Sequence, residues 1–197
     1  IAFSAIEQVD SPFVQRLYNY FGDIETAYKA TLADLSQIDG LSIKKSEKFI
    51  ENRNKLDIEK TLDEVLKRKI KFYTFETPNY PELLKEISDP PSVLYYKGNS
   101  DLCNFKKTLA IVGSRKASYN ARDAVEKIIS ELSGTDICIV SGLASGIDTS
   151  AHTSALKHDL KTIGVIASGF DYVYPASNRS LYEQIENGGG LVVSEYY

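Results

Sequence analysis

Apolar residues recur every three or four positions through the first sixty residues of the chain, a spacing that predicts short amphipathic helices. Phe13 and Leu17 mark the first helix. Its start is predicted at Ser11-Pro12, because Ser favours the N-cap position and Pro the first helical position. Gly22 is expected to end it. Further segments of the same kind follow, so residues 1–62 are predicted to form a small all-helical module.

The stretch from Leu35 to Ile50 has the outline of a helix-hairpin-helix motif. That motif normally has two glycines in its turn, since glycine lets backbone amides approach a nucleic-acid phosphate closely. Only Gly40 is present here. A contact with nucleic acid and plain helix packing therefore both remain open for this hairpin.

The pattern changes to strand, loop and helix in the second part of the chain, residues 63–197. After strand-like segments near 70–75 and 93–96, short apolar runs cover 108–112, 137–140, 162–167 and 191–194, and helical patterns separate them. Continuous apolar strands are typical of a parallel sheet covered on both faces. The second part is therefore predicted to be a doubly wound α/β domain, in which right-handed crossovers bring the strand-to-helix loops to one edge of the sheet.

The first of these loops, Gly113-Ser114-Arg115, has the chemistry of an anion site. Glycine lets the backbone approach a ligand, serine supplies a hydroxyl, and the planar guanidinium suits a phosphate. A tight turn with a solvated arginine is the alternative interpretation.

The second loop supplies four further candidate phosphate-binding residues, Ser141, Gly142, Ser145 and Gly146. Asp148 and His152 come next, four positions apart on one helical face, where they could form an acid–base pair. The alternative is that Asp148 binds loop amides while the imidazole is oriented beside it. No nucleophile or metal ligand accompanies the two residues, which favours the alternative.

The third loop ends at Asn178-Arg179. Asn178 is well placed to cap the helix that begins after it. In a second interpretation, Asn178 and Arg179 contact the same anion as Arg115. Tyr172 and Tyr174 on this loop offer stacking faces for an unpaired base.

The composition limits the possible classes of protein. Hydrophobic residues make up 43% and charged residues 25% of 197 residues, with a formal net charge of -4. These values argue against disorder and against a cationic coat for nucleic acid. Apolar runs are too short for a membrane span, and two distant cysteines suggest neither a zinc site nor a disulfide scaffold, so a cytoplasmic protein is expected. Because the chain starts at Ile1 and contains no Met, the natural N-terminus is expected to be missing.

Several motifs, taken together, resemble the DprA/Smf family (DNA-processing protein A). They are YPELLKEISDPP (80–91), LYYKG (94–98), AIVGSR (110–115), SGLASGIDTSAH (141–152), TIGVI (162–166), GFDYVYPASN (169–178) and SEY (194–196). The resemblance implies an N-terminal SAM-like module followed by an extended Rossmann-like domain, and a homodimer. It also implies a protein without enzymatic activity or cofactor, which binds single-stranded DNA during natural transformation, protects it and helps load the RecA recombinase.

Carried over to this chain, the resemblance makes Gly113, Ser114 and Arg115 the central phosphate-binding motif, with the 141–146 loop and Asn178 lining the same pocket. Two features depart from the family. Ala176 stands where a basic residue is frequent, so that Arg179 becomes the candidate replacement. The chain also stops at Tyr197, where family members continue, which suggests a C-terminally truncated chain.

Two other classes of function remain as alternatives. Related Rossmann-like folds include nucleotide hydrolases, but their PGGxGT motif is absent, as are the GxGxxG and P-loop signatures. A sensor for a small nucleotide messenger would use the same pocket without catalysis. Titration with free nucleotides and with a single-stranded oligonucleotide distinguishes these classes.

Overall fold

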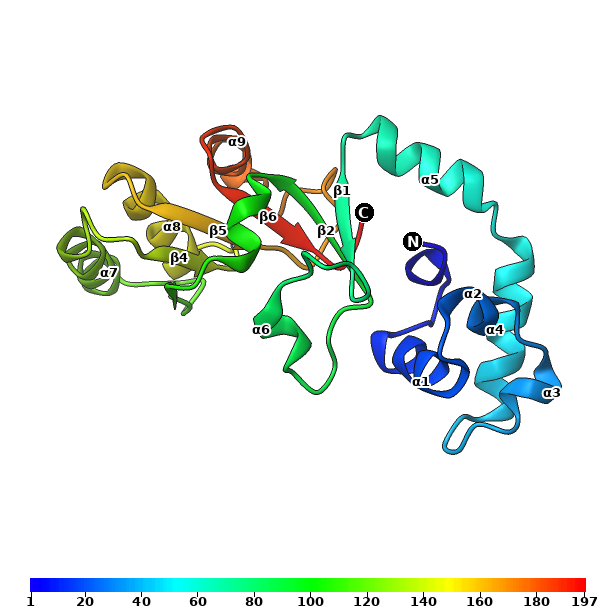
Figure 1. The fold of residues 1–197 in the computed structure, drawn as a ribbon. Helices are drawn as coiled ribbons and strands as arrows, with labels where there is room; N and C mark the ends of the chain where they lie inside the picture. The colour runs from blue at the N-terminus through cyan, green and yellow to red at the C-terminus, as the bar shows by residue number, and fades with distance from the viewer.

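The computed structural model describes residues 1–197 and consists of a helical bundle beside a larger lobe built on a sheet (Figure 1). The bundle contains η1 (Phe3–Ala5), α1 (Ser11–Phe21), α2 (Ile24–Lys29), α3 (Leu32–Leu35) and α4 (Ile43–Lys55). No helix of the protein has the length and apolar character required to cross a membrane.

The bundle has an apolar core of its own, centred on aromatic rings. Phe3 and Phe49 stack with their ring centroids 5.5 Å apart, and Leu17 is fully buried among them. The predicted cap at Ser11 is wrong. Asp10 caps α1 by accepting a hydrogen bond from the Phe13 amide, which frees Ser11 to accept one from the Ser92 amide of the sheet lobe.

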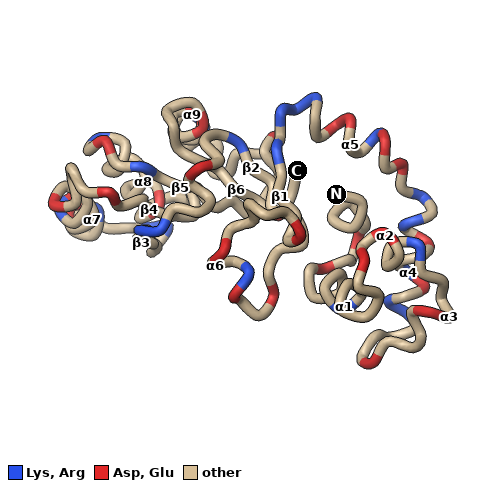
Figure 2. The backbone as a smooth tube through the Cα atoms, viewed as in Figure 1, with Lys and Arg blue, Asp and Glu red and all other residues tan.

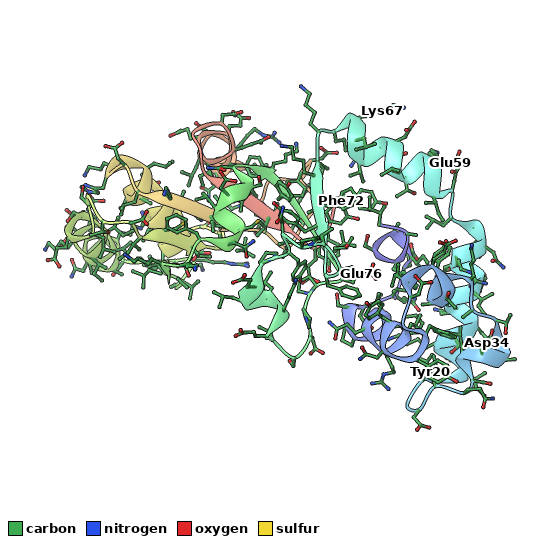
Figure 3. All side chains as sticks on the ribbon, viewed as in Figure 1. Tyr20, Asp34, Glu59, Lys67, Phe72 and Glu76 are labelled. Atoms are coloured by element: carbon green, nitrogen blue, oxygen red, sulfur yellow. The ribbon has the colours of Figure 1, made fainter.

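The two lobes are linked by α5 (Ile58–Lys67), whose Glu59 and Lys67 side chains project into solvent (Figure 3). Leu56, just before this helix, packs on the bundle core, whereas Val65 belongs to a core cluster of the sheet lobe. The predicted domain boundary after residue 62 falls inside α5, and the division at that point stays a prediction.

The sheet has six strands in the order β1-β2-β6-β5-β4-β3. Neighbours pair in parallel from β3 to β6, and β2 and β1 extend the sheet in antiparallel fashion. The mainly parallel α/β sheet expected from the sequence is confirmed. The strands are β1 (Lys71–Thr74), β2 (Val93–Gly98), β3 (Thr108–Ala110), β4 (Cys138–Ser141), β5 (Lys161–Val165) and β6 (Leu191–Ser194).

Helices cover both faces of the sheet. On one face, Ile139 and Val192 pack in clusters formed with the crossover helices α7 (Tyr119–Glu131), α8 (Ile147–Lys157) and α9 (Arg179–Asn187). On the other, Cys138 and Leu191 pack in a cluster with residues of α6 (Glu82–Lys85) and η2 (Ser100–Asn104). Side chains alternate between these faces along each strand, which explains why the strands read as continuous apolar runs.

Candidate functional site

Three loops meet at the carboxyl ends of β3, β4 and β5, as expected from the sequence. Hydrogen bonds join each loop to the next. The Ile147 amide donates to the Ser114 carbonyl at 3.2 Å, and the Asn178 side-chain amide donates to the Leu143 carbonyl at 2.9 Å. The candidate residues of the three loops therefore form one connected surface.

The first loop presents unused hydrogen-bond donors to solvent. Gly113, Ser114 and Arg115 are exposed, and their three backbone N–H groups donate to no acceptor in the protein. The Ser114 hydroxyl accepts from the Lys116 amide at 3.1 Å and keeps its own proton free to donate. Successive free amides beside a guanidinium match the oxygens of an anion. This part of the loop has the properties that the sequence predicted.

A glycine locks the first and second loops together. Gly146 adopts φ 82° and ψ -120°, a conformation that essentially only glycine tolerates. A Cβ atom at this position would lie 2.2 Å from the Ser114 carbonyl oxygen. In the same way, a Cβ on Gly113 would lie 2.7 Å from the Ile147 side chain. Gly146 thus allows the backbones of the two loops to touch, and Gly113 leaves room for the Ile147 side chain.

The second loop uses most of its polar groups internally. The buried Ser141 hydroxyl donates to the Ile111 carbonyl at 2.6 Å, and the buried Asp148 carboxylate accepts from the Gly142 and Ala144 amides. Ser145 is half-buried, and its hydroxyl has no partner in the protein. Of the two hydroxyls proposed from this loop, only that of Ser145 is available to a ligand without rearrangement.

Asp148 and His152 do not form an acid–base pair, because no hydrogen bond joins them. His152 is completely buried, and its Nδ1 lies 2.7 Å from the Thr162 hydroxyl. Burial lowers its pKa to about 4, with the Ser141 backbone and Asp148 acting in the opposite direction. His152 is therefore a neutral group of the core at pH 7.

In the third loop, Asn178 does not have the predicted capping role. Its side chain does not cap α9. Instead it is buried and donates to the Leu143 carbonyl and to the Thr149 hydroxyl at 2.9 and 2.8 Å. The short η3 turn (Ala176–Asn178) directs the side chain inward, so that α9 begins without a side-chain cap. Arg179 is exposed and forms no ion pair, and both loop tyrosines, 172 and 174, are exposed.

Three exposed residues near the first loop were not among the sequence candidates. Lys116 follows Arg115, and Tyr119 and Arg122 lie on the first turn of α7. The Tyr119 side chain is 81% exposed, unusually high for a tyrosine in a helix. The sequence feature that could have identified these three residues is the run of basic and aromatic residues directly after the Gly113-Ser114-Arg115 motif.

Four unpaired cations lie around the three loops. Lys and Arg are interspersed with Asp and Glu along the backbone (Figure 2). Some basic side chains of the helices pair with a carboxylate, as Lys127 does with Asp123, and others have no such partner. The cations around the three loops belong to the second group, with no acidic partner within 4.0 Å: Arg115, Lys116, Arg122 and Arg179.

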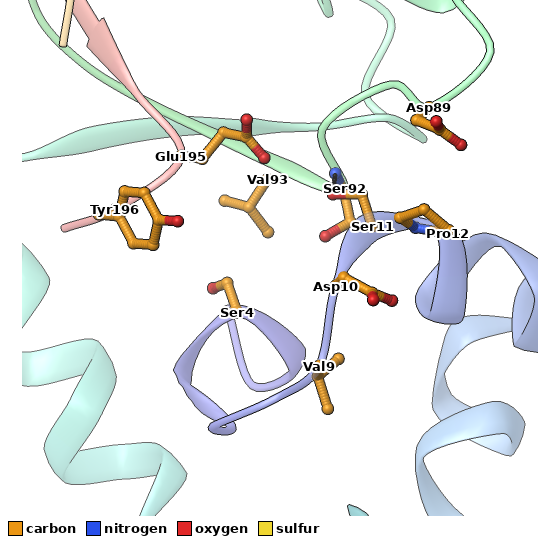
Figure 4. A pocket seen from close by; sticks show the side chains of 10 residues that line it. All are labelled: Ser4, Val9, Asp10, Ser11, Pro12, Asp89, Ser92, Val93, Glu195 and Tyr196. Carbon is orange, nitrogen blue, oxygen red and sulfur yellow. Dashed lines mark hydrogen bonds between the residues drawn. The ribbon is translucent and has the colours of Figure 1, made fainter. Parts of the chain in front are cut away.

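A separate pocket between the two lobes has the opposite character. It encloses about 330 Å³ and is lined by Asp10, Asp89 and Glu195 together with serine hydroxyls (Figure 4). Three carboxylates disfavour a phosphate there. The loop edge is therefore the better candidate for an anionic ligand.

The side chains that commonly bind metals lie apart from one another in the fold. No group of three or more His, Cys, Asp or Glu side chains is arranged to hold a metal ion. Burial raises the pKa of the free thiols of Cys103 and Cys138 to about 12, which keeps both protonated at pH 7.

Comparison with known proteins gives a consistent result. A family model described as DNA recombination-mediator protein A matches residues 71–197. Protein Smf of Synechocystis sp. is 38% identical over 199 residues, covering 100% of this chain and 50% of that protein. DNA processing protein DprA of Streptococcus pneumoniae is 50% identical over 117 residues, covering 59% of this chain and 40% of that protein. The chain thus spans about half the length of these relatives or less.

Two solved structures resemble the fold. The X-ray structure of DNA processing protein A from S. pneumoniae has a TM-score of 0.79 and 36% identity, covering 98% of this chain and 64% of that one. The DNA processing protein A of Helicobacter pylori, for which a single-stranded DNA binding mode is described, has a TM-score of 0.55 and 30% identity, covering 64% of this chain and 56% of that one. On these matches, the chain belongs to the DprA/Smf family of DNA-processing, recombination-mediator proteins.

Proposed function

We propose that this chain binds single-stranded DNA without reading its sequence, through the edge formed by the three loops. The observation that carries the proposal is the set of free backbone amides at Gly113, Ser114 and Arg115 beside an unpaired guanidinium. Amides and arginine recognise phosphate oxygens, which every nucleotide presents alike. The H. pylori relative, with its described single-stranded DNA binding mode, supports the same assignment.

The site suits a single strand better than a duplex. Tyr172 and Tyr174 are exposed on the third loop, where their rings are available to stack on unpaired bases. A duplex hides these base faces. The loop edge has few cations, and the net charge of the whole chain is -4. Binding therefore has to be local rather than spread over a basic surface. Affinity is therefore expected to depend on single residues.

Ligand contacts within the site are assigned to its exposed residues and to half-buried Ser145, whose hydroxyl has no partner in the protein. Gly113, Ser114, Arg115, Ser145 and Arg179 contact the phosphates directly. The other candidates hold these groups in place through their hydrogen bonds and close contacts: buried Ser141 and Asn178, half-buried Gly142 and the tightly packed Gly146. This division changes the role expected of four of the predicted site residues from contact to support.

Turnover of DNA or nucleotides is not part of the proposal. The buried Asp148 carboxylate is engaged by two amides, and His152 contacts Thr162 rather than a nucleophile. No positioned base therefore accompanies a nucleophile or water in the site. Release of base or phosphate from a nucleotide by the purified protein, abolished by Asp148→Asn, would favour a nucleotide hydrolase instead.

Family membership extends the proposal to protection of incoming DNA during natural transformation, to loading of RecA and to homodimer formation through the sheet lobe. Sedimentation of the 197-residue chain tests the homodimer. A strictly monomeric chain at all concentrations would contradict homodimer formation by these residues.

The decisive experiment for the proposed site is Arg115→Ala, measured by fluorescence anisotropy with mixed-sequence single strands over a range of salt concentrations. The substitution should weaken binding to all sequences about equally and reduce the salt slope by about 0.7, the contribution of one phosphate. Arg115→Lys should restore affinity only in part, because an ammonium lacks the planar two-point contact. Exposed Lys60 on α5 gives the charge-matched control, Lys60→Ala. Equal affinities and slopes for wild type and Arg115→Ala would disprove the assignment.

A further inference from the structure

A groove runs between the first turns of α7 and α8, next to the Gly113-Ser114-Arg115 loop. Its volume is about 300 Å³, and it is open to solvent along the helices. Both helices contribute polar or aromatic side chains to it: Tyr119, Arg122, Asp123 and Glu126 lie on α7, and Ser150 and Thr153 on α8.

The two carboxylates of the groove are already neutralised by partners in the protein. Asp123 forms an ion pair with Lys127, at 2.8 Å. Glu126 accepts hydrogen bonds from Lys157, His158 and Ser154, and these contacts lower its pKa to about 2. The groove therefore does not repel an anion as its two acidic residues would suggest.

The cation and the aromatic ring of the groove have no partners. Arg122 is exposed and belongs to no ion pair, and the Tyr119 ring is 81% exposed. The two residues are three positions apart on one helix, where side chains of this spacing lie about 5–6 Å from each other at their Cβ atoms. Ser118 fixes the start of the helix by accepting a hydrogen bond from the Ala121 amide. A ring and a guanidinium thus start from neighbouring positions at the beginning of one helix.

We propose that this groove is a second nucleotide subsite, in which a base stacks on Tyr119 and its phosphate contacts Arg122. The exposed Thr153 hydroxyl, which has no partner in the protein, supplies a further donor from α8. This inference rests on the proposed function, because it extends the path of the same single strand beyond Arg115. The bound DNA strand then runs along α7 and α8, away from the acidic pocket between the lobes.

The distance between the two subsites suits one continuous strand. Arg115 and Tyr119 are four positions apart in the sequence, so their Cα atoms lie no more than about 14 Å apart even if the chain between them is fully extended. Lys116 lies between them and is unpaired. A strand that covers a site of about 4–16 nucleotides spans both subsites.

The test compares a normal oligothymidylate of about 16 nucleotides with an abasic strand of equal phosphate count. Tyr119→Ala should weaken binding of the normal strand about 10-fold and leave the abasic strand unchanged. Arg122→Ala should weaken both strands and reduce the salt slope by about 0.7. The matched controls are Tyr20→Ala, which removes an exposed ring from the outer surface of α1 (Figure 3), and Lys60→Ala.

A tryptophan reporter gives a second readout that does not depend on affinity. The chain contains no Trp, so Tyr119→Trp places a single indole in the groove. Saturation with oligothymidylate should quench its fluorescence and leave that of Tyr20→Trp unchanged.

The outcomes separate the two proposals. Wild-type affinity in Tyr119→Ala and Arg122→Ala, with no quenching in Tyr119→Trp, would overturn the second subsite if Arg115→Ala still weakened binding. If Arg115→Ala had no effect either, the proposed function itself would fail.

Discussion

Replacing Gly146 by Ala tests whether the first two loops depend on each other. The new Cβ would lie 2.2 Å from the Ser114 carbonyl oxygen and 2.8 Å from the carbonyl carbon and oxygen of Arg115. All three atoms belong to the backbone, so no side chain can rotate away. Relief of the overlap requires the Gly113-Ser114-Arg115 loop to move by roughly 1 Å, the difference between this approach and an ordinary van der Waals contact.

The expected cost has two parts. Backbone strain at φ 82° contributes about 1–3 kcal/mol for a residue other than glycine, and overpacking contributes about as much. Together they predict a loss of about 2–6 kcal/mol in the free energy of unfolding. For a protein of this size, each kcal/mol lowers Tm by roughly 2–4 °C.

Thermal unfolding and anisotropy with single-stranded DNA measure the two consequences of Gly146→Ala. At a temperature where the variant remains folded, displacement of the free amides should weaken binding about 10-fold, a loss of ~1.4 kcal/mol. Gly134→Ala is the matched control. Its φ is similar, +75°, but no atom lies within 4 Å of the new Cβ, so only the backbone strain remains. If both variants lost the same stability and neither lost affinity, the interlocking of the loops would be refuted.

Three further predictions concern groups that are wholly or partly buried in the sheet lobe. The pKa of His152 is lowered from 6.5 to about 4, so the unfolded chain binds the proton more readily, and urea unfolding should show that stability falls by about 2 kcal/mol from pH 7 to pH 5. His152→Gln should flatten that dependence, whereas an unchanged slope would assign it to other groups. Asn178→Ala leaves the Leu143 carbonyl and the Thr149 hydroxyl without their donor, and thermal unfolding should detect a loss of about 1–3 kcal/mol that exposed Ser177→Ala does not cause. Because both thiols have a pKa near 12, Ellman's reagent at pH 8 should react with the unfolded chain much faster than with the native one, and equal rates would contradict their burial.

The repeated alternation of apolar strand, glycine loop and helix was sufficient to predict the sheet and the edge where the loops meet. That pattern reflects burial on both faces, a property that each strand carries in its own residues. The predicted ends of the strands were less accurate. The run 108–112 predicts a strand to Val112, but β3 ends at Ala110 and Val112 is 73% exposed, because β3 lies at the edge of the sheet and has one neighbouring strand rather than two.

Individual side-chain roles were harder to predict, because they depend on partners distant in sequence. Ser11 was a plausible cap, yet its partner is the Ser92 amide, 81 positions away. Asn178 stands at a favourable capping position, yet it donates to residues of the second loop, up to 35 positions away. Local spacing carries no information about such contacts. The motif Gly113-Ser114-Arg115 was easier to interpret from sequence, because its amides and its guanidinium face solvent and need no partner within the chain.

The hydrogen bonds of Asn178 and the close contact at Gly146 have a thermodynamic consequence for ligand binding. Since both join neighbouring loops, the backbone donors of the site are already ordered before a ligand arrives, and little conformational entropy remains to be lost on association. The ordering cost of the site is met instead during folding, by groups to which the proposed function assigns no contact with the ligand. Substitution of Asn178, which adds no overlapping atom, should therefore raise the dissociation constant mainly through a larger entropic penalty, while the enthalpy of each phosphate contact stays nearly unchanged.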